Sequence, residues 1–290
     1  MEPREEAARS ASSSGGGALY LVATPIGNLA DITLRAIEVL AAVDLILAED
    51  TRTSARLLAR HRITTPMASC HEHNERARCA EMVGRIRRGA SIALISDAGT
   101  PLLSDPGFPL VEACIAAGVP VHPIPGASSL LAALAASGLP PYPFTFLGFL
   151  PRKGRDRRRR IEEIVACRHT VVVLESARRV GATLEELLRA GGGGLQAVLA
   201  RELTKLHEEF VRDSLEGLAR QVAQRPPRGE VVLLFAPDPE LGAEVDDETI
   251  IAALADSGLR DHSASARARA VARRLGVDKQ RVYHLIHRAR

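Results

Sequence analysis

Apolar runs alternate with amphipathic segments along most of the chain. Continuous apolar runs predict strands buried on both faces, and strands that alternate with helices predict a mostly parallel sheet covered by helices on both sides. The first half of the chain is therefore expected to form an α/β domain. Its expected strands are 18–23, 45–48, 67–69, 92–95 and 119–124, and its expected helices are 33–42, 54–60, 76–87, 109–117 and 128–136.

The alternation is interrupted by a stretch rich in proline and phenylalanine. Proline is poorly tolerated inside helices and central strands, so we interpret 139–153 as a linker. It separates a first α/β domain, 18–138, from a second one, 154–238. The second domain is expected to contain helices 157–166, 178–190 and 215–224 and strands 170–175, 197–200, 211–213 and 230–236.

The two ends of the chain differ from this body. Residues 1–17 form a polar leader rich in Gly and Ser, which we expect to be disordered. Residues 239–290 carry apolar residues at helical spacing on both sides of a Gly-centred turn, a pattern typical of a helix-turn-helix. The same spacing also fits a helical module that packs without touching nucleic acid, and both interpretations stay open.

The distribution of charge points to a polyanionic partner. The formal net charge is only +3, yet 151–160 carries seven basic residues against one acidic, and 260–290 carries nine against two. Two basic segments on a near-neutral body indicate a nucleic-acid partner, although arginine-rich helices can also be merely solvated. Aromatic residues make up 3% of the chain, with no Trp, which gives no support for a surface that stacks several bases.

Several common sites are disfavoured. The four cysteines show no C-x-x-C spacing, which favours reduced thiols in a cytoplasmic protein over disulfides or zinc. The H-E-H-N segment at 71–74 lacks the H-E-x-x-H spacing, so no metal is expected. No phosphate loop or dinucleotide fingerprint occurs, and no apolar run is long enough to span a membrane.

Loops rich in Gly, Pro, Ser and Asp follow three of the expected strands. They are T-P-I-G-N (24–28), S-D-A-G-T-P-L-L-S-D-P-G (96–107) and P-G-A-S-S (125–129). Small residues let the main chain approach a ligand closely, and ligand sites of α/β proteins form at the carboxyl ends of strands. These loops predict one elongated small molecule held mainly by main-chain groups.

Charged residues also cluster directly after expected strands. Such residues need water, partners or a ligand, and parallel strands would bring the clusters to one functional rim. The clusters are Glu49, Asp50 and Arg52; His71, Glu72, His73, Asn74 and Glu75; Glu175, Ser176 and Arg178; and Arg201, Glu202, Lys205 and His207.

Seven segments stand out together: T-P-I-G-N-L (24–29), A-E-D-T-R (48–52), H-E-H-N-E (71–75), the loop 96–107, P-G-A-S (125–128), G-F-L-P-R-K (148–153) and R-E-L-T-K-L-H-E-E (201–209). In this order they resemble a bacterial family of ribosomal RNA methyltransferases in the tetrapyrrole methylase superfamily. Two segments depart from that pattern, because P-G-A-S replaces P-G-P-S and E-S-A-R-R replaces E-S-P-H-R. The second departure leaves the roles of Arg178 and Arg179 open.

The resemblance implies an enzyme that uses S-adenosylmethionine to methylate the ribose 2′-hydroxyl of a cytidine in the decoding region of 16S ribosomal RNA, within the small ribosomal subunit. It also implies two α/β domains of the tetrapyrrole methylase type, with the cofactor in the cleft between them, and a homodimer. The cofactor positions implied by the superfamily are Pro25, Gly99, Thr100, Pro101, Leu103, Ser128, Ser129, Glu175, Ser176 and Ala200.

A catalytic hypothesis follows from the chemistry of the reaction. A sulfonium donor carries its own leaving group, so the enzyme mainly aligns the reactants, and a base should assist the weakly nucleophilic hydroxyl. We hypothesise that Glu202 or Asp50 accepts the proton or positions the hydroxyl. Lys205 and Arg52 would orient the neighbouring phosphate. The expected RNA contacts are His71, Glu72, His73, Asn74, Arg152 and Lys153.

Two rival interpretations stay open. One keeps the fold and the cofactor but replaces RNA by a tetrapyrrole or a protein acceptor. The other is a ribosome-binding module that has lost turnover.

Overall fold

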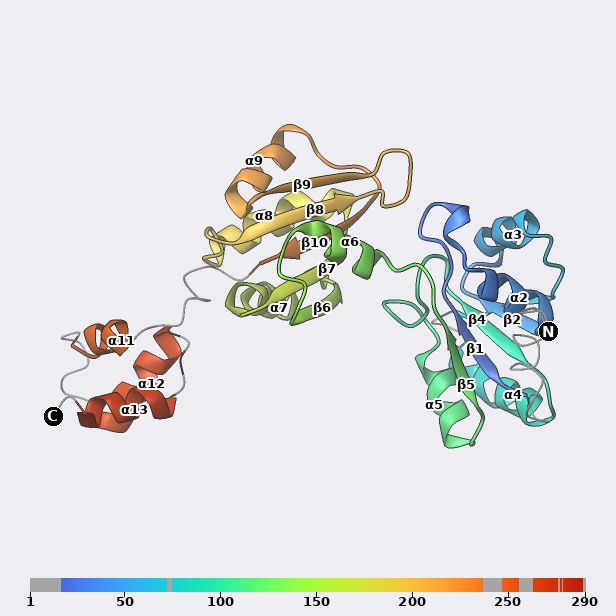
Figure 1. Ribbon diagram of the computed structural model, residues 1–290, viewed down its shortest axis with the longest axis horizontal. Coiled ribbons are helices and arrows are strands. Elements are labelled where there is room, and N and C mark those ends of the chain that lie inside the picture. The colour runs from blue at the N-terminus through green and yellow to red at the C-terminus, as the bar shows by residue number, and fades with distance from the viewer. Residues whose placement is uncertain are drawn as a thin grey trace, which may run out of the picture.

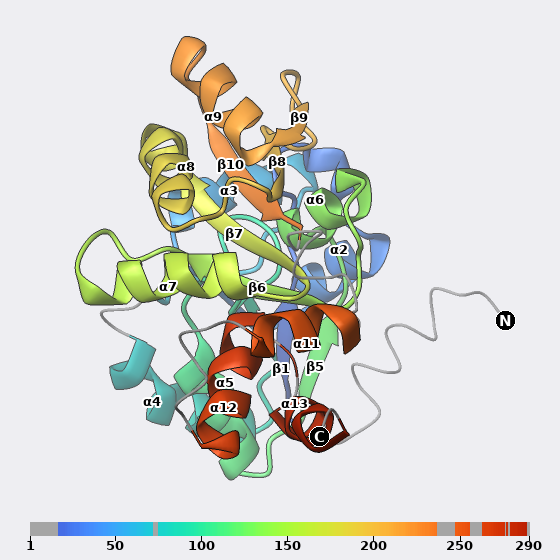
Figure 2. The same ribbon diagram turned by 90° about the vertical axis from the view of Figure 1, so that its left-hand side faces the viewer.

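The computed structural model describes residues 17–71, 75–236, 247–255, 263–275, 277 and 279–288. These residues form two α/β domains and a group of three C-terminal helices (Figures 1 and 2). Apart from Gly17, the polar leader expected at 1–17 lies outside the described residues.

The first domain contains a five-stranded sheet in the order β3-β2-β4-β1-β5, and every pair in it is parallel. This confirms the parallel sheet predicted from the apolar runs. Because all strands point the same way, their carboxyl ends share one edge. The strands are β1 (Leu19–Val22), β2 (Leu45–Ala48), β3 (Met67–Ser69), β4 (Ile92–Ile95) and β5 (Val121–Ile124).

Helices cover both faces of this sheet, because alternate strand residues point to opposite sides. Ala93 and Ile95 of β4 pack in the cluster on the side of α2 and α3, whereas Ile92 and Leu94 pack on the side of α4 and α5. The helices are α2 (Leu34–Ala42), α3 (Thr51–Arg60), α4 (Glu75–Arg87) and α5 (Phe108–Ala116).

The second sheet differs from the expected parallel arrangement. Its order is β6-β7-β10-β8-β9, and only β6 and β7 pair in parallel. Apolar runs do not encode strand direction, so the sequence pattern could not reveal this. The strands are β6 (Phe144–Phe149), β7 (Thr170–Ser176), β8 (Gln196–Arg201), β9 (Glu209–Ser214) and β10 (Glu230–Phe235).

The strand directions still place the predicted charged segments on one edge. Strands β7 and β8 both run antiparallel to β10, which lies between them, so β7 and β8 point the same way. Their carboxyl ends therefore lie beside the amino end of β10, where Ser176 is opposite Glu230 and Arg201 is opposite Val231.

The segment 139–153, expected to link the domains, contains β6, an edge strand of the second sheet. Prolines just before an edge strand break no ladder hydrogen bond, which is why a proline-rich stretch can hold a strand. Helix α6 (Ser129–Ser137) packs its Leu130, Ala133 and Leu134 against the second sheet. The other face of that sheet is covered by α7 (Arg155–Ala166), α8 (Val180–Arg189) and α9 (Leu215–Gln224).

The C-terminal helices form a cluster of their own. They are α11 (Asp247–Leu254), α12 (Ala264–Leu275) and α13 (Lys279–Arg288), and their buried residues pack on one another. Arg281 donates two hydrogen bonds to Asp247, joining α13 to α11. The helical tail predicted from its periodicity is therefore present.

Candidate active site between the two sheets

A cleft of about 460 Å³ lies between the domains, at the strand ends described above. This volume lies in the range of small-molecule and cofactor sites. Both domains supply its walls. The lining residues are Ile26, Glu49, Asp97, Ala98, Leu103, Ser104, Asp105, Ser129, Phe149, Leu174, Glu175, Ser176, Leu203 and 229–232.

The loops after β1 and β4 are tied together at the cleft. Thr24 and Gly99 exchange main-chain hydrogen bonds of 2.9 and 3.0 Å, and the buried Thr24 hydroxyl donates to the Ser96 carbonyl. Gly99 has φ +86°, a conformation that L side chains rarely adopt. Pro25 lines an adjoining hollow. The two loops thus form one main-chain wall of the cleft, at the place where the sequence predicts a ligand held by main-chain groups.

The loop after β4 also contacts the loop after β5. The Thr100 hydroxyl donates to the Ala127 carbonyl at 3.3 Å, and Pro101 follows within the same turn. Leu102 and Ser104 both have φ near +75°, an unfavourable conformation held by the surrounding contacts, and Leu103 between them faces the cleft.

Helix α6 begins beside this wall. Ser128 is its N-cap and accepts a hydrogen bond from the Leu131 N–H, whereas Ser129 lines the cleft. Of the two serines implied as cofactor contacts, Ser128 therefore has a local structural role, and Ser129 faces the ligand space.

The Glu175 carboxylate is bound on the side of β7 that faces α7 and α8. It is fully buried, accepts from the Thr183 hydroxyl at 2.9 Å, and pairs with Arg179 at 3.1 Å and Arg157 at 3.7 Å. Its contribution to the cleft is therefore main chain. Ser176 lines the cleft, but Ala200 is buried against α6 and does not reach the surface.

Three carboxylates meet in the cleft: Glu49 after β2, and Asp97 and Asp105 in the loop after β4. Burial raises the pKa of Asp105 to about 6, helped by the charges of Glu49 and Asp97 and opposed by a hydrogen bond with Ser96. Burial, then Asp97 and Asp50, also raise the pKa of Glu49, while His71 lowers it. The sequence placed Glu49 in a charged cluster but did not single out Asp97 or Asp105, because their position beside Glu49 depends on the pairing of β2 with β4.

Asp50 and Arg52 lie beside the cleft and bind each other. Asp50 caps α3 by accepting from the Arg52 N–H at 2.8 Å, and the guanidinium donates two more bonds at 3.1 and 2.8 Å. These hydrogen bonds lower the pKa of Asp50 to about 2. A carboxylate with so low a pKa is a weak proton acceptor.

Glu202 and Lys205 lie at the cleft edge of the β8–β9 loop. Glu202 accepts from the Glu230 N–H and from the Lys205 ammonium, both at 3.1 Å, and Lys205 also binds the Glu230 carboxylate at 3.0 Å. The main-chain bond, followed by Lys205, lowers the pKa of Glu202. The structure thus brings both predicted pairs to the rim, each engaged in an ion pair.

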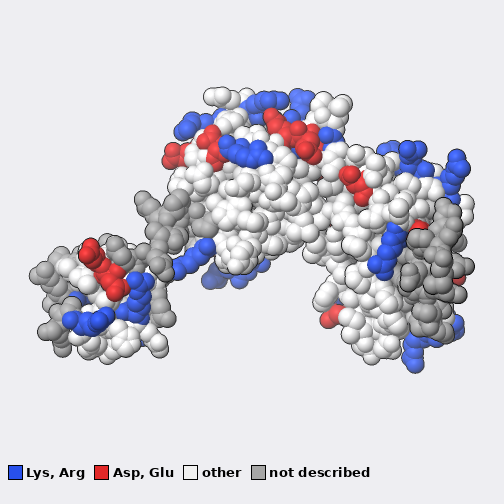
Figure 3. Space-filling model, in the orientation of Figure 1, with Lys and Arg blue, Asp and Glu red and all other residues white. Residues whose placement is uncertain are grey.

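The expected RNA contacts are only partly described. His71 follows β3 and is half-buried, whereas Glu72, His73 and Asn74 lie outside the described residues. Arg152 and Lys153 follow β6 and line a hollow with Arg158 and Arg189. Basic side chains gather over α7 in this part of the surface (Figure 3).

Within the described ranges, no three His, Cys, Asp or Glu side chains are grouped as metal ligands, and no helix has the length and apolar character needed to cross a bilayer.

Comparisons with known proteins agree with this architecture. The profile of the Tetrapyrrole (Corrin/Porphyrin) Methylases matches residues 18–219. A Synechocystis protein named Ribosomal RNA small subunit methyltransferase I is 44% identical over 257 residues, which cover 89% of each chain. A protein of the same name from Mesorhizobium japonicum is 46% identical over 92% of this chain and 90% of its own.

Solved structures share the fold at low identity. The uroporphyrin-III C-methyl transferase of Thermus thermophilus, complexed with S-adenyl homocysteine, aligns with a TM-score of 0.55 at 23% identity, over 76% of this chain and 97% of its own. Diphthine synthase aligns with a TM-score of 0.60 at 15% identity, over 76% of this chain and 90% of its own.

Proposed function

The chain belongs to the tetrapyrrole methylase family, in the branch of the ribosomal RNA small subunit methyltransferases I, and on this premise we propose that it transfers the methyl group of S-adenosylmethionine to a cytidine ribose 2′-hydroxyl in 16S ribosomal RNA. The observation that carries this proposal is the interdomain cleft, walled by the three small-residue loops whose sequences led to the family.

The residues of the cleft fit such a cofactor. The positive φ of Gly99 lets main chain form the wall, and the carboxylates of Glu49, Asp97 and Asp105 complement a cationic sulfonium and amino group. Pro25, Gly99, Thr100, Pro101, Leu103, Ser129 and Ser176 would hold it, with Ser128, Glu175 and Ala200 supporting these contacts from behind. The bound cofactor supplies an electrophilic methyl group and a neutral leaving group.

The chain's own residues must align the hydroxyl and accept its proton. We assign the proton to Asp105, because this carboxylate lies in the cleft and its pKa of about 6 leaves it mostly ionised yet basic at neutral pH. Asp50 and Glu202, whose pKa values are lowered, suit the other role proposed for them, which is positioning the hydroxyl. Lys205 and Arg52 would orient the adjacent phosphate.

RNA binding would extend from the cleft onto the basic surface. We propose that Arg152 and Lys153, both exposed after β6, contact phosphates of the RNA. His71 at the end of β3, with Glu72, His73 and Asn74 beyond it, would face the same substrate. The assembled small subunit as substrate and a homodimer complete the proposal on the ground of the family resemblance, and a cytoplasmic location on the ground of the cysteine spacing.

Methyl acceptors distinguish this proposal from its rivals. Purified protein is incubated with methyl-labelled cofactor and either naked 16S RNA, assembled small subunits lacking the modification, or no RNA. Label that enters RNA in either RNA arm, and nothing in the third, supports the proposed function. Label that enters neither RNA arm contradicts it.

A further inference from the structure

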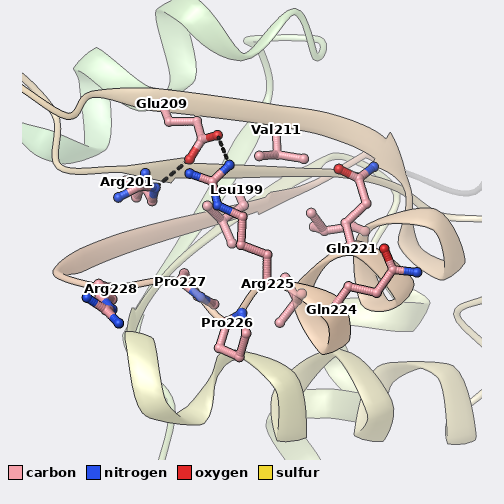
Figure 4. A pocket seen from close by; sticks show the side chains of 12 residues that line it. Leu199, Arg201, Glu209, Val211, Gln221, Gln224, Arg225, Pro226, Pro227 and Arg228 are labelled. Carbon is pink, nitrogen blue, oxygen red and sulfur yellow. Dashed lines mark hydrogen bonds and ion pairs between the residues drawn. The ribbon is translucent and has the colours of Figure 1, made fainter.

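A groove of about 450 Å³ opens on the opposite face of the second sheet from the cleft, beneath the end of α9 (Figure 4). The apolar side chains of Leu199 and Val211 form part of its floor. Arginine and glutamine side chains surround its mouth, and the function proposed above uses none of them. They are Arg201, Gln221, Gln224, Arg225 and Arg228.

The groove carries an excess of positive charge. Its one carboxylate, Glu209, pairs with Arg201 at 2.5 Å and more loosely with Arg225 at 3.6 Å. Arg225 is 79% exposed, and Arg228 has neither an ion pair nor a hydrogen bond with the described parts of the chain. Three guanidinium groups against one carboxylate leave about two positive charges available to an anion.

The groove adjoins the methyl-transfer cleft. Arg228 is followed directly by Gly229, which lines the cleft, and Arg201 pairs in register with Val231, another cleft residue. The groove and the cleft are therefore separated only by the edge of the second sheet at which β8 ends and β10 begins.

The same edge has basic residues at its other end. Strand β6 lies three strand positions from β8, about 14 Å away at ordinary strand spacing, and leads into Arg152 and Lys153. The cleft thus lies between two basic regions.

We propose that this groove binds phosphates of the substrate RNA, so that the strand crosses the cleft with one flank on Arg225 and Arg228 and the other on Arg152 and Lys153. This inference rests on the proposed function. Guanidinium groups suit the ligand, because their planar donors match phosphate oxygens. A phosphate would displace Glu209 from Arg225, the weaker of its two pairs.

The test compares Arg225→Gln/Arg228→Gln with Arg87→Gln/Arg88→Gln. The control arginines are exposed at the end of α4, on the edge of the first sheet away from the cleft. Affinity for assembled small subunits is measured between 50 and 200 mM KCl, and cofactor affinity by calorimetry reports folding. We expect the groove variant to bind subunits about tenfold more weakly, with a salt slope reduced by about 1.4, and the control to match the unmodified protein.

A second variant acts in the opposite direction. Glu209→Gln removes the competing carboxylate, so it should tighten subunit binding and steepen the salt slope. If the unmodified protein methylates RNA but the groove variant keeps its affinity and slope, or the control loses as much, the groove proposal is overturned and the proposed function stands. If the unmodified protein methylates no RNA, the proposed function itself fails.

Discussion

The main-chain N–H of Asn28 donates to the Thr204 hydroxyl at 3.0 Å, which joins the first loop of one domain to the β8–β9 loop of the other. The contact is close-packed, because a Cβ on Gly27 would lie 2.6 Å from Lys205 Cγ and 3.0 Å from the Leu203 carbonyl. These contacts between the loop after β1 and the β8–β9 loop therefore hold the two walls of the cleft in a fixed relative position.

Gly27→Ala should weaken cofactor binding. The added methyl group must push the loops apart, and overpacking of this kind costs on the order of 1.4 kcal/mol, or about tenfold in affinity. Calorimetric titration with S-adenosylmethionine measures the change. Gly84→Ala is the matched control, since a Cβ there meets only the tip of Arg88 at 3.4 Å. Equal affinities for the two variants would contradict an interdomain contact that shapes the site.

Asp105→Asn should slow methyl transfer by on the order of a hundredfold, because the amide cannot accept the proton. In the unmodified protein the single-turnover rate should fall as pH drops through about 6, where Asp105 becomes protonated beside Glu49 and Asp97. Rapid-quench measurements on saturated enzyme give the rate of the variant and the pH dependence of the rate in the unmodified protein. A rate in the variant within threefold of normal would remove Asp105 from this role.

The same substitution should raise the melting temperature. The folded-state pKa of Asp105 lies above its ordinary value of 3.8, so between about 4 and 6 the folded protein holds a proton that the unfolded chain has released. The stability of the folded protein therefore declines as pH rises through that window. A neutral amide at position 105 avoids this loss of stability. Calorimetry at pH 7.5 checks this, and a lower melting temperature would indicate a structural role instead.

Asp50→Asn should leave the midpoint of the pH profile where it is. The hydrogen bonds from Arg52 lower the pKa of Asp50 to about 2, so its charge does not change in the working range. Asn is also a good N-cap, so α3 should remain stable, whereas Asp50→Ala should lower the melting temperature. Movement of the midpoint in Asp50→Asn would instead identify Asp50 as the group that titrates.

Much of the first domain was predictable because its central strands β1, β2 and β4 are apolar and mostly buried. The run Ile92–Ile95 is apolar at every position, and all four residues are buried in the parallel sheet. The second sheet was less predictable, because the direction of β10 depends on which neighbours it pairs with. Strand β6 was hidden by the prolines just before it, which an edge position tolerates.

Glu175→Gln should destabilise the fold more than it weakens cofactor binding. The amide leaves the buried Arg157 without its full countercharge, and breaking a buried pair from one side costs about 3 kcal/mol. Chemical denaturation measures the loss, and cofactor titration well below the transition measures affinity. A large loss of affinity with unchanged stability would assign Glu175 to the cofactor directly.

The location of the site could be predicted from the sequence, but the roles of its residues could be predicted less well. Strand ends rich in Gly, Pro and charge identified the rim, because chain order alone places them after buried strands. The different roles of the carboxylates could not be predicted, since Asp50 and Asp105 look alike in sequence. Only the fold reveals that Asp50 is held in an ion pair by Arg52, while Asp105 lies in the cleft with Glu49 and has a raised pKa.

The central claim is that the cleft delivers a methyl group to a ribose oxygen of small-subunit RNA. Small subunits lacking the modification are incubated with the protein and deuterated S-adenosylmethionine, and the RNA is then digested and sequenced by mass spectrometry. The account predicts one labelled cytidine in the decoding region, with the label retained on the ribose. Label on a base, on protein or on no product would contradict it.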